Sequence, residues 1–291
     1  MLRPVALFTL ALGGCPTPTP LDTDTGNADE TDTSSDETGE TDLADTDLAD
    51  TDPIDTDAET DQADTDIVDT DLSEPMNAHS LAFDGVDDHL LVALDTGSWS
   101  ALTVELWVRP ERQDVIETWM GKGYSETFDA WSLGHDSQGQ PQVSVRDTLS
   151  GAIAYGSASL VPLNTWTHVA LVCLDDGYPK LYVNGSLIAT SFNYAEFLSS
   201  ELPIRIGGGN ALDGGSHRPF QGRLDEVRVW SVARSPSELA SDKDRTLTGA
   251  EPNLELLLSF EENWDDRAAD HHTLSSSEPE SEPLYSTDVP F

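Results

Sequence analysis

The sequence is poor in cysteine and in basic residues. It has two cysteines in 291 residues, and 14 Lys and Arg stand against 55 Asp and Glu, for a formal net charge of −41. Two cysteines cannot build the disulfide framework on which small secreted domains depend. A chain this acidic also lacks the basic footprint that binding to a phosphate backbone requires, so we expect no nucleic-acid partner. Cations suit it better as small ligands.

The first 75 residues lack what a folded core needs. All seven tryptophans lie after position 98, and residues 16–75 contain no aromatic residue. Residues 22–74 hold 22 of the 55 acids and no Lys or Arg, with Asp-Thr-Asp units that begin at Asp45, Asp50, Asp55, Asp64 and Asp69. No unit has both the glycine and the closing glutamate of an EF-hand loop. Because like charges repel and extend a chain, residues 15–75 are predicted to be a disordered acidic linker.

A short leader precedes this linker. Arg3 is its one positive charge, the apolar run Val5 to Leu12 follows, and Gly13-Gly14-Cys15 ends it. This is the layout of a secretory signal, and the apolar run is too short to span a bilayer. The L-G-G-C ending resembles a bacterial lipoprotein lipobox, whose cysteine becomes the lipidated first residue of the mature protein. We predict a signal peptide over residues 1–14, lipidation at Cys15, and membrane attachment through the lipid alone; the alternative is an ordinary signal peptide with an incidental cysteine.

From Ser80 onward the apolar residues recur with a period of two, as in strands with one buried face. Asn184-Gly185 supplies the two positive φ angles of a type I′ hairpin turn. The run Gly222 to Ser235 is predicted to be a strand that stops where Ser235 caps a short helical turn opened by Pro236. Strict alternation would set Asp225, Val227 and Val229 on one face of that strand and Leu224, Glu226, Arg228 and Trp230 on the other. Other expected strands include Ser80–Phe83, His89–Leu94, Leu102–Arg109, Asp114–Gly121, Phe128–Gly134, Gln142–Asp147, Trp166–Leu174 and Leu254–Glu262.

Several motifs occur in a fixed order: L-A-F-D-G-V-D-D-H-L from Leu81, L-T-V-E-L-W-V-R-P from Leu102, N-T-W-T-H-V-A-L-V from Asn164, L-Y-V-N-G from Leu181 and F-Q-G-R-L-D-E-V-R-V-W from Phe220. With these motifs the chain resembles the bacterial LamG-like jelly-roll domains of the concanavalin A-like lectin/glucanase superfamily. The strand pattern and this resemblance predict an all-β fold, an antiparallel two-sheet jelly-roll sandwich over residues 76–274, with a polar C-terminal tail over 275–291. The resemblance implies recognition of glycans or surface partners, and a structural calcium ion in some members.

Calcium is the metal that the acidic residues favour. Asp84, Asp87 and Asp88 lie in one turn near the start of the predicted domain, and Asp225 lies in a strand near its end. Calcium takes six to eight oxygen ligands, so a turn carboxylate and one from a neighbouring strand would form half of a cage. We predict a structural Ca²⁺ at Asp84, Asp88 and Asp225. The alternative is turn chemistry at Asp84-Gly85 without a metal.

Catalytic patterns are missing. No E-x-D-x-E run supplies the paired carboxylates of a glucanase, and there is no G-x-S-x-G elbow. Glu105 and Glu226 are single strand carboxylates, which we interpret as salt-bridged on a polar sheet face. His271-His272 lacks metal-ligand spacing, and His168 and Cys173 are interpreted as core residues. Aromatic platforms and polar groups for a sugar could come from Tyr124, Phe128, Trp131, Tyr155, Tyr194 and the loop Gly207 to Arg218, although each of these aromatic residues is more often found in a core than on a binding surface.

These features predict a non-catalytic, lipid-anchored protein of the bacterial outer membrane or cell surface, which displays a module that binds a glycan or another surface macromolecule. A structural or adhesive envelope protein that contacts another protein is the alternative. A polysaccharide-acting hydrolase is a remote third.

Overall fold

The computed structural model describes residues 77–125, 128–147, 151–156, 160–174, 177–191, 197–209, 217–261, 263–276 and 279–291. All of these belong to a compact unit that spans Val68–Phe291. The predicted signal peptide, Cys15 and the acidic linker lie outside the described residues. In the described part, no helix is long and apolar enough to cross a membrane.

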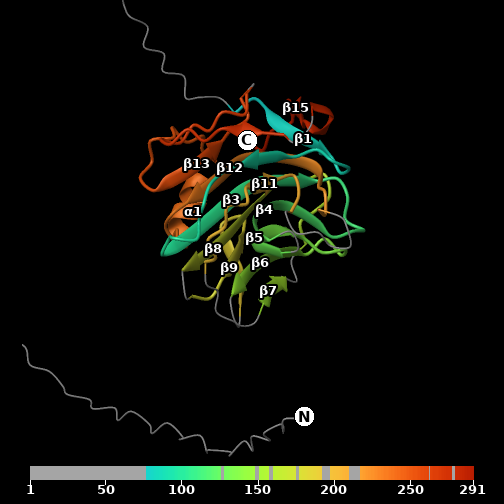
Figure 1. Cartoon of the computed structure of the whole chain (residues 1–291). Helices are drawn as coiled ribbons and strands as arrows, with labels where there is room; N and C mark the ends of the chain where they lie inside the picture. The colour runs from blue at the N-terminus through green and yellow to red at the C-terminus, as the bar shows by residue number, and fades with distance from the viewer. Residues whose placement is uncertain are drawn as a thin grey trace, which may run out of the picture. The chain divides into compact units, whose positions relative to one another are not determined.

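The described strands form two antiparallel sheets, as the sequence predicts (Figure 1). Sheet A has the order β10 (Ser186–Thr190), β9 (Lys180–Val183), β8 (Thr167–Leu174), β3 (Ala101–Pro110), β12 (Gln221–Trp230), β1 (Ser80–Asp84) and β15 (Leu284–Ser286), with β13 (Leu254–Leu258) also paired to β12. Sheet B has the order β14 (Leu274–Ser275), β2 (Leu90–Val92), β11 (Ile204–Ile206), β4 (Glu117–Ser125), β5 (Phe128–His135), β6 (Pro141–Asp147) and β7 (Gly151–Gly156).

The core lies between the inner faces of the two sheets. Alternate residues of β3 and β8, such as Leu102, Val104 and Leu171, are fully buried and pack with Trp131 and Leu133 of β5. Burial of such side chains stabilises a fold by about 25 cal/mol per Å² of apolar surface. Cys173 of β8 is part of this core, as predicted. Trp131 is 1% exposed, so its interpretation as a sugar platform is wrong.

A bulge in β12 overturns the predicted division of its faces. Asp225 pairs with Trp107 and Arg228 with Glu105, so two residues of β12 lie opposite Leu106 alone. Glu226 takes the left-handed backbone conformation, with φ 47°, and a bulge of this kind reverses the alternation of side chains beyond it. Leu224, Val227 and Val229 therefore all face the core, whereas strict alternation sets Leu224 apart from the valines.

The predicted turn and helix are present. Asn184 and Gly185 have φ angles of 48° and 77° and connect β9 to β10 as a type I′ turn does. Ser235 caps α1 (Pro236–Asp242) in a capping box with Glu238. Leu239 of α1 packs on Ala170, Val172 and Tyr182, so the helix covers the outer face of sheet A at β8 and β9.

The C-terminal segment belongs to the sandwich. β14 pairs with β2 at the edge of sheet B, and β15 pairs with β1 at the edge of sheet A. A single turn of 3-10 helix, η1 (Pro279–Ser281), lies between them. The residues predicted to be a polar tail from 275 onward thus supply an edge strand to sheet A.

Candidate functional site

A group of buried polar side chains gathers where β12 changes partners. β1 pairs with Gln221 to Leu224 of β12, and β13 pairs with Val227 to Trp230. Asp225 and Glu226 lie between these stretches, beside the residues that precede β1 and those that follow β13. We call Asn77, Asp225, Glu226 and Glu261 the acidic junction.

The acidic junction holds oxygen atoms that have no hydrogen-bond donor. Asp225 and Glu226 are 0% and 1% exposed. Oδ1 of Asp225 accepts from the Glu226 amide at 2.7 Å, and the Asn77 side chain lies close enough to the Asp225 carboxylate to lower its pKa by hydrogen bonding. Oδ2 of Asp225 and Oε1 of Glu226 are buried and have no well-formed hydrogen bond among the described residues. Glu261 accepts from the Ala78 amide at 2.9 Å. Because a buried polar atom without a partner costs on the order of 1–3 kcal/mol, this arrangement is not explained by stability within the chain.

At the acidic junction, the ionised forms of Asp225 and Glu226 are disfavoured. Burial, and then the charge of Glu226, raises the pKa of Asp225 well above its ordinary value. Burial also raises the pKa of Glu226, although the Arg228 guanidinium opposes the shift. Either a proton or a bound cation would relieve both groups. Oxygen-only ligands fit Ca²⁺, and Asn77, Asp225, Glu226 and Glu261 all carry such oxygens. Among the described residues, however, the carboxylates whose oxygens lie within 4.8 Å of one another are those of Asp84, Asp87 and Asp88.

The acidic turn at Asp84, Asp87 and Asp88 is a different arrangement. The three side chains offer oxygens within 4.8 Å of one another. Oδ1 of Asp84 accepts from the amides of Val86 and Asp87, and Oδ2 of Asp88 accepts from the Asp84 amide at 2.8 Å. Burial, together with the charges of Asp84 and Asp87, raises the pKa of Asp88. These backbone contacts are those of a turn that is stable without a metal.

The structure does not bring Asp225 to the acidic turn. Asp84 pairs with Gln221, whereas Leu224, the neighbour of Asp225, pairs with Leu81. At about 3.3 Å per strand residue, Asp225 lies roughly 13 Å from Asp84 along the sheet. The predicted ligands Asp84 and Asp88 therefore lie together, and Asp225 belongs to the acidic junction instead.

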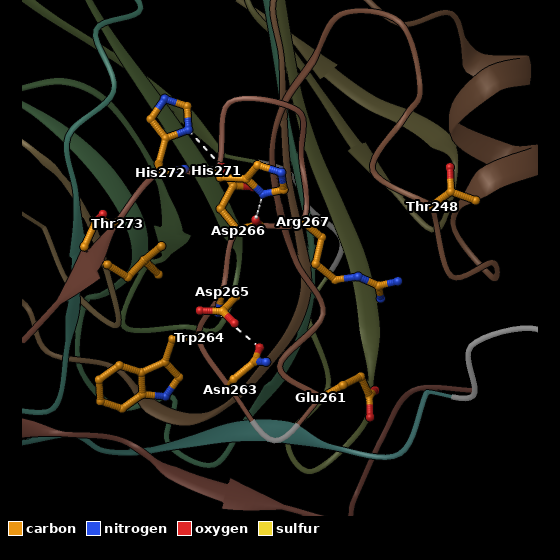
Figure 2. Close-up of a pocket in the computed structure, with 11 residues that line it drawn as sticks. Thr248, Glu261, Asn263, Trp264, Asp265, Asp266, Arg267, His271, His272 and Thr273 are labelled. Atoms are coloured by element: carbon orange, nitrogen blue, oxygen red, sulfur yellow. Dashed lines mark hydrogen bonds and ion pairs between the residues drawn. The ribbon is translucent and has the colours of Figure 1, made fainter.

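A pocket of about 730 Å³ adjoins the acidic junction through Glu261. The segment from Asn263 to Leu274 forms most of its wall, and Thr248 contributes from the loop before β13. Figure 2 shows Trp264 and Asn263 at one end of this pocket and His271 and His272 at the other, with Arg267 between them. Small-molecule sites place a few convergent polar groups among apolar and aromatic side chains. This pocket is more polar, with Trp264 and Leu274 as its apolar residues.

Asp266 fixes the shape of this wall. Its buried carboxylate accepts from the amides of Leu257, Ala268 and His272, each at 2.9 Å, and from Nδ1 of His272 at 2.8 Å. Nδ1 of His271 lies 2.9 Å from the Asp266 carbonyl oxygen. Because Nδ1 of each ring faces an acceptor, Nδ1 carries the proton and Nε2 of a neutral ring keeps its lone pair. Both histidines can then accept a hydrogen bond from a ligand hydroxyl group.

Trp264 is the aromatic residue of the pocket. Its ring is partly buried and packs against the core on one side, and its Nε1 is buried without a partner among the described residues. Arg267 donates from NH1 to Oγ of Ser259 at 3.0 Å, which holds its guanidinium beside the pocket. The pocket thus combines a fixed aromatic ring with donors and acceptors in fixed positions.

Glu105 belongs to a paired ionic layer and has no catalytic geometry. Its oxygens accept from Nε1 of Trp230 at 2.8 Å and NH1 of Arg234 at 3.0 Å, and lie 3.1 Å from Nε2 of His168. Burial alone would raise its pKa, but the hydrogen bond from His168 and the charges of His168, Arg228 and Arg234 hold the pKa at about 2. Arg228 pairs with Glu226 at 2.7 Å. The interpretation of Glu105 and Glu226 as salt-bridged is confirmed, although this sheet face is buried.

Residues 84–240, more than half of the chain, match the family described as the concanavalin A-like lectin/glucanases superfamily. The chain belongs to this superfamily. The resemblance carried by the sequence motifs is thereby confirmed, as is the fold class. The superfamily match ends before the pocket wall, which begins at Glu261.

Among proteins of known structure, a candidate carbohydrate-binding protein from Bacteroides ovatus aligns with a TM-score of 0.54 and 21% identity, over 72% of this chain and 60% of that one. A heptameric SAP-like pentraxin from Limulus polyphemus aligns with a TM-score of 0.48 and 19% identity, over 69% and 96%. Mouse pappalysin-1 is 34% identical over 104 residues, which are 34% of this chain and 6% of that protein. The chain thus spans a small part of this curated relative.

Sequence reasoning missed the pocket. Asn263, Trp264 and Arg267 follow the last strand expected from the sequence, Leu254–Glu262, and His271 and His272 were considered only as metal ligands. Of the aromatic platforms predicted, Tyr194 and the side chains of Tyr124, Phe128 and Tyr155 lie outside the described residues. An isolated tryptophan in a polar stretch after the closing strand was the signal that could have indicated the pocket.

Proposed function

We propose that this protein is a non-catalytic, lipid-anchored surface protein whose superfamily domain binds a glycan. The observation that carries the proposal is the pocket at residues 261–274, where the Trp264 ring lies among amide, hydroxyl, imidazole and guanidinium groups. A sugar presents apolar C–H faces and many hydroxyl groups, and this pocket offers a partner for each. The superfamily and the fold shared with the Bacteroides ovatus protein support a binding module.

The test is a glycan array probed with the full chain and with Trp264→Ala. We expect the wild-type chain to retain one class of sugar reproducibly. The Trp264→Ala chain should bind that class at least about ten-fold more weakly, because truncation of an aromatic residue at the centre of a binding site costs on the order of 2 kcal/mol.

Tyr178→Ala is the matched control. Tyr178 is 43% exposed and lies just before β9 in sheet A, so its removal deletes a surface aromatic away from the pocket. Equal loss of binding in both variants would contradict the pocket assignment. A blank array together with capture of one envelope protein would favour the adhesive alternative, and turnover of a polysaccharide that is lost in Glu226→Gln would favour the hydrolase.

Calcium at the acidic junction is part of this proposal. Glu261 contacts the Ala78 amide, belongs to the junction and also lines the pocket. An ion held by Asp225, Glu226 and Asn77 would therefore stabilise the pocket wall at Glu261, the residue where the wall begins. The acidic turn at Asp84 and Asp88 stays a prediction as a second calcium site.

Lipid anchoring at Cys15 is the remaining part. The acidic linker would then hold the domain away from the outer membrane or cell surface by charge repulsion along its length. Cys15→Ser should move the protein into the soluble fraction of cells, as followed by immunoblotting. Continued membrane association of Cys15→Ser would refute the anchor and leave the glycan-binding proposal intact.

A further inference from the structure

Arg205 lies on the outer face of sheet B. Its strand neighbours Ile204 and Ile206 are fully buried in the core, so Arg205 points to the opposite side. It pairs with Leu91 of β2 and Gly121 of β4, and Gly121 pairs in turn with Ser132 of β5. On the β4 and β5 side, the row beside Arg205 therefore consists of the small residues Gly121 and Ser132.

The guanidinium of Arg205 has no carboxylate partner among the described residues. Its Nε is buried without a hydrogen bond, and the residue as a whole is partly exposed. Burial alone lowers its pKa to about 10. By contrast, Arg228 and Arg234 on sheet A each form buried ion pairs with glutamate.

Histidines, glycines and the carboxylate of Asp129 surround Arg205. A Cβ at Gly121 would lie 3.4 Å from Cγ of Asp129, and a Cβ at Gly209 would lie 3.0 Å from its Oδ2. A Cβ at Gly208 would lie 3.3 Å from Nε of Arg205, so the glycine keeps the backbone close to the guanidinium. The charge of Arg205 acts on His217 and His89, whose pKa values are lowered mainly by burial and then, in part, by this charge. Nδ1 of His217 lies 3.0 Å from the carbonyl oxygen of Gly209, so Nδ1 carries the proton and Nε2 is an acceptor.

We propose that Arg205 binds the carboxylate group of an acidic sugar on the outer face of sheet B. A guanidinium recognises a carboxylate through paired N–H···O bonds. The hydroxyls of Ser132 and of Ser144, which pairs with it, and the acceptor nitrogen of His217 offer partners for the hydroxyl groups of the same ring. The site is separate from the pocket at residues 261–274, so either assignment can fail while the other holds.

The test is ligand-observed saturation-transfer NMR on the full chain with D-glucuronate and D-glucose, which differ at the carboxylate, and with inorganic phosphate as a competitor. We expect saturation transfer to glucuronate and much less to glucose. Arg205→Gln should weaken glucuronate binding on the order of 10- to 100-fold, the range for a lost hydrogen bond to a charged group. Thermal melts establish that this variant is folded.

Two variants serve as controls. Arg245→Gln removes the same charge from an arginine whose side chain is 61% exposed and pairs with Asp242, and it should bind glucuronate like the wild type. Tyr178→Ala, which removes an exposed aromatic residue just before β9 of sheet A, should also retain glucuronate binding. Wild-type affinity in Arg205→Gln, equal binding of glucose, loss of glucuronate binding in Tyr178→Ala, or binding of phosphate without glucuronate would each overturn the proposal.

Discussion

Two buried carboxylates on the same pair of strands have opposite electrostatics. Glu105 of β3 and Asp225 of β12 are both 0% exposed, and β3 pairs with β12 throughout this region. The pKa of Glu105 is held at about 2 by a histidine and two arginines that outweigh its burial. The pKa of Asp225 is raised well above its ordinary value, because burial and neighbouring carboxylates act together.

Glu105 and Asp225 differ in how far the chain itself satisfies their carboxylate oxygens. Glu105 accepts from three side chains within the chain, so its charge is fully used by the fold. Asp225 and Glu226 each keep one buried oxygen without a well-formed hydrogen bond among the described residues. Burial alone is therefore uninformative about ligands, whereas a buried carboxylate oxygen that the chain leaves unpaired can be satisfied by a proton or by a cation.

The largest expected effect is that of a substitution at Glu105, the carboxylate that is paired within the chain. Glu105→Gln should lower the free energy of unfolding by about 3–5 kcal/mol, because it removes the buried negative charge that faces Arg228, Arg234 and His168. Urea denaturation measures the change. Glu111→Gln is the control, since its partly exposed pairs with Arg109 and Arg223 should contribute at most about 1 kcal/mol. Equal losses in the two variants would contradict the structural role assigned to Glu105.

As the pH falls, Glu105 and Asp225 should change the free energy of unfolding in opposite directions. Glu105 has a folded pKa of about 2 against an ordinary 4.5, so its contribution, up to about 3 kcal/mol, is present above pH 4.5 and is lost as the pH falls toward 2. Asp225 has a raised folded pKa, so in EDTA stability should first increase as the pH falls through that pKa toward 3.8. Urea titrations at a series of pH values test this, and Asp225→Asn should abolish the initial increase while keeping the acid loss.

Calcium bound at the acidic junction should act through Asp225, the carboxylate that the chain leaves partly unpaired. At a concentration about 100 times its Kd, Ca²⁺ would stabilise the folded chain by about 2.7 kcal/mol, measured as a higher melting temperature than in EDTA. Asp225→Asn should remove this increase and leave stability in EDTA unchanged or higher. Asp84→Asn, in the acidic turn, should keep it. If the rise in melting temperature with Ca²⁺ is lost in Asp84→Asn and kept in Asp225→Asn, the ion binds at the acidic turn and not at the acidic junction.

The sequence predicted the sandwich well because its signals are local. Alternating apolar residues, the Asn184-Gly185 turn and the Ser235 cap each determine structure over a few residues, and all three are confirmed. The division of faces in β12 was wrong because Glu226 takes a conformation that glycine usually supplies. No residue type in the strand indicates that bulge.

The candidate site could be predicted only in part, because it depends on contacts distant in sequence. Asp225 was identified as a candidate calcium ligand, but its neighbours Asn77 and Glu261 reach it only through the pairing of β1 and β13 with β12. Arg205 was not singled out, since the sequence contains 55 acids that might have paired with it. Whether a charge is paired is a property of the folded chain.

The central claim is that the superfamily domain binds a glycan through the pocket wall. The most direct measurement is hydrogen–deuterium exchange of the full chain, in calcium, with and without the glycan that it retains on the array. The account predicts slower amide exchange at residues 261–274 in the presence of the glycan. Slower exchange confined to sheet A around α1, or no retained glycan at all, would contradict it.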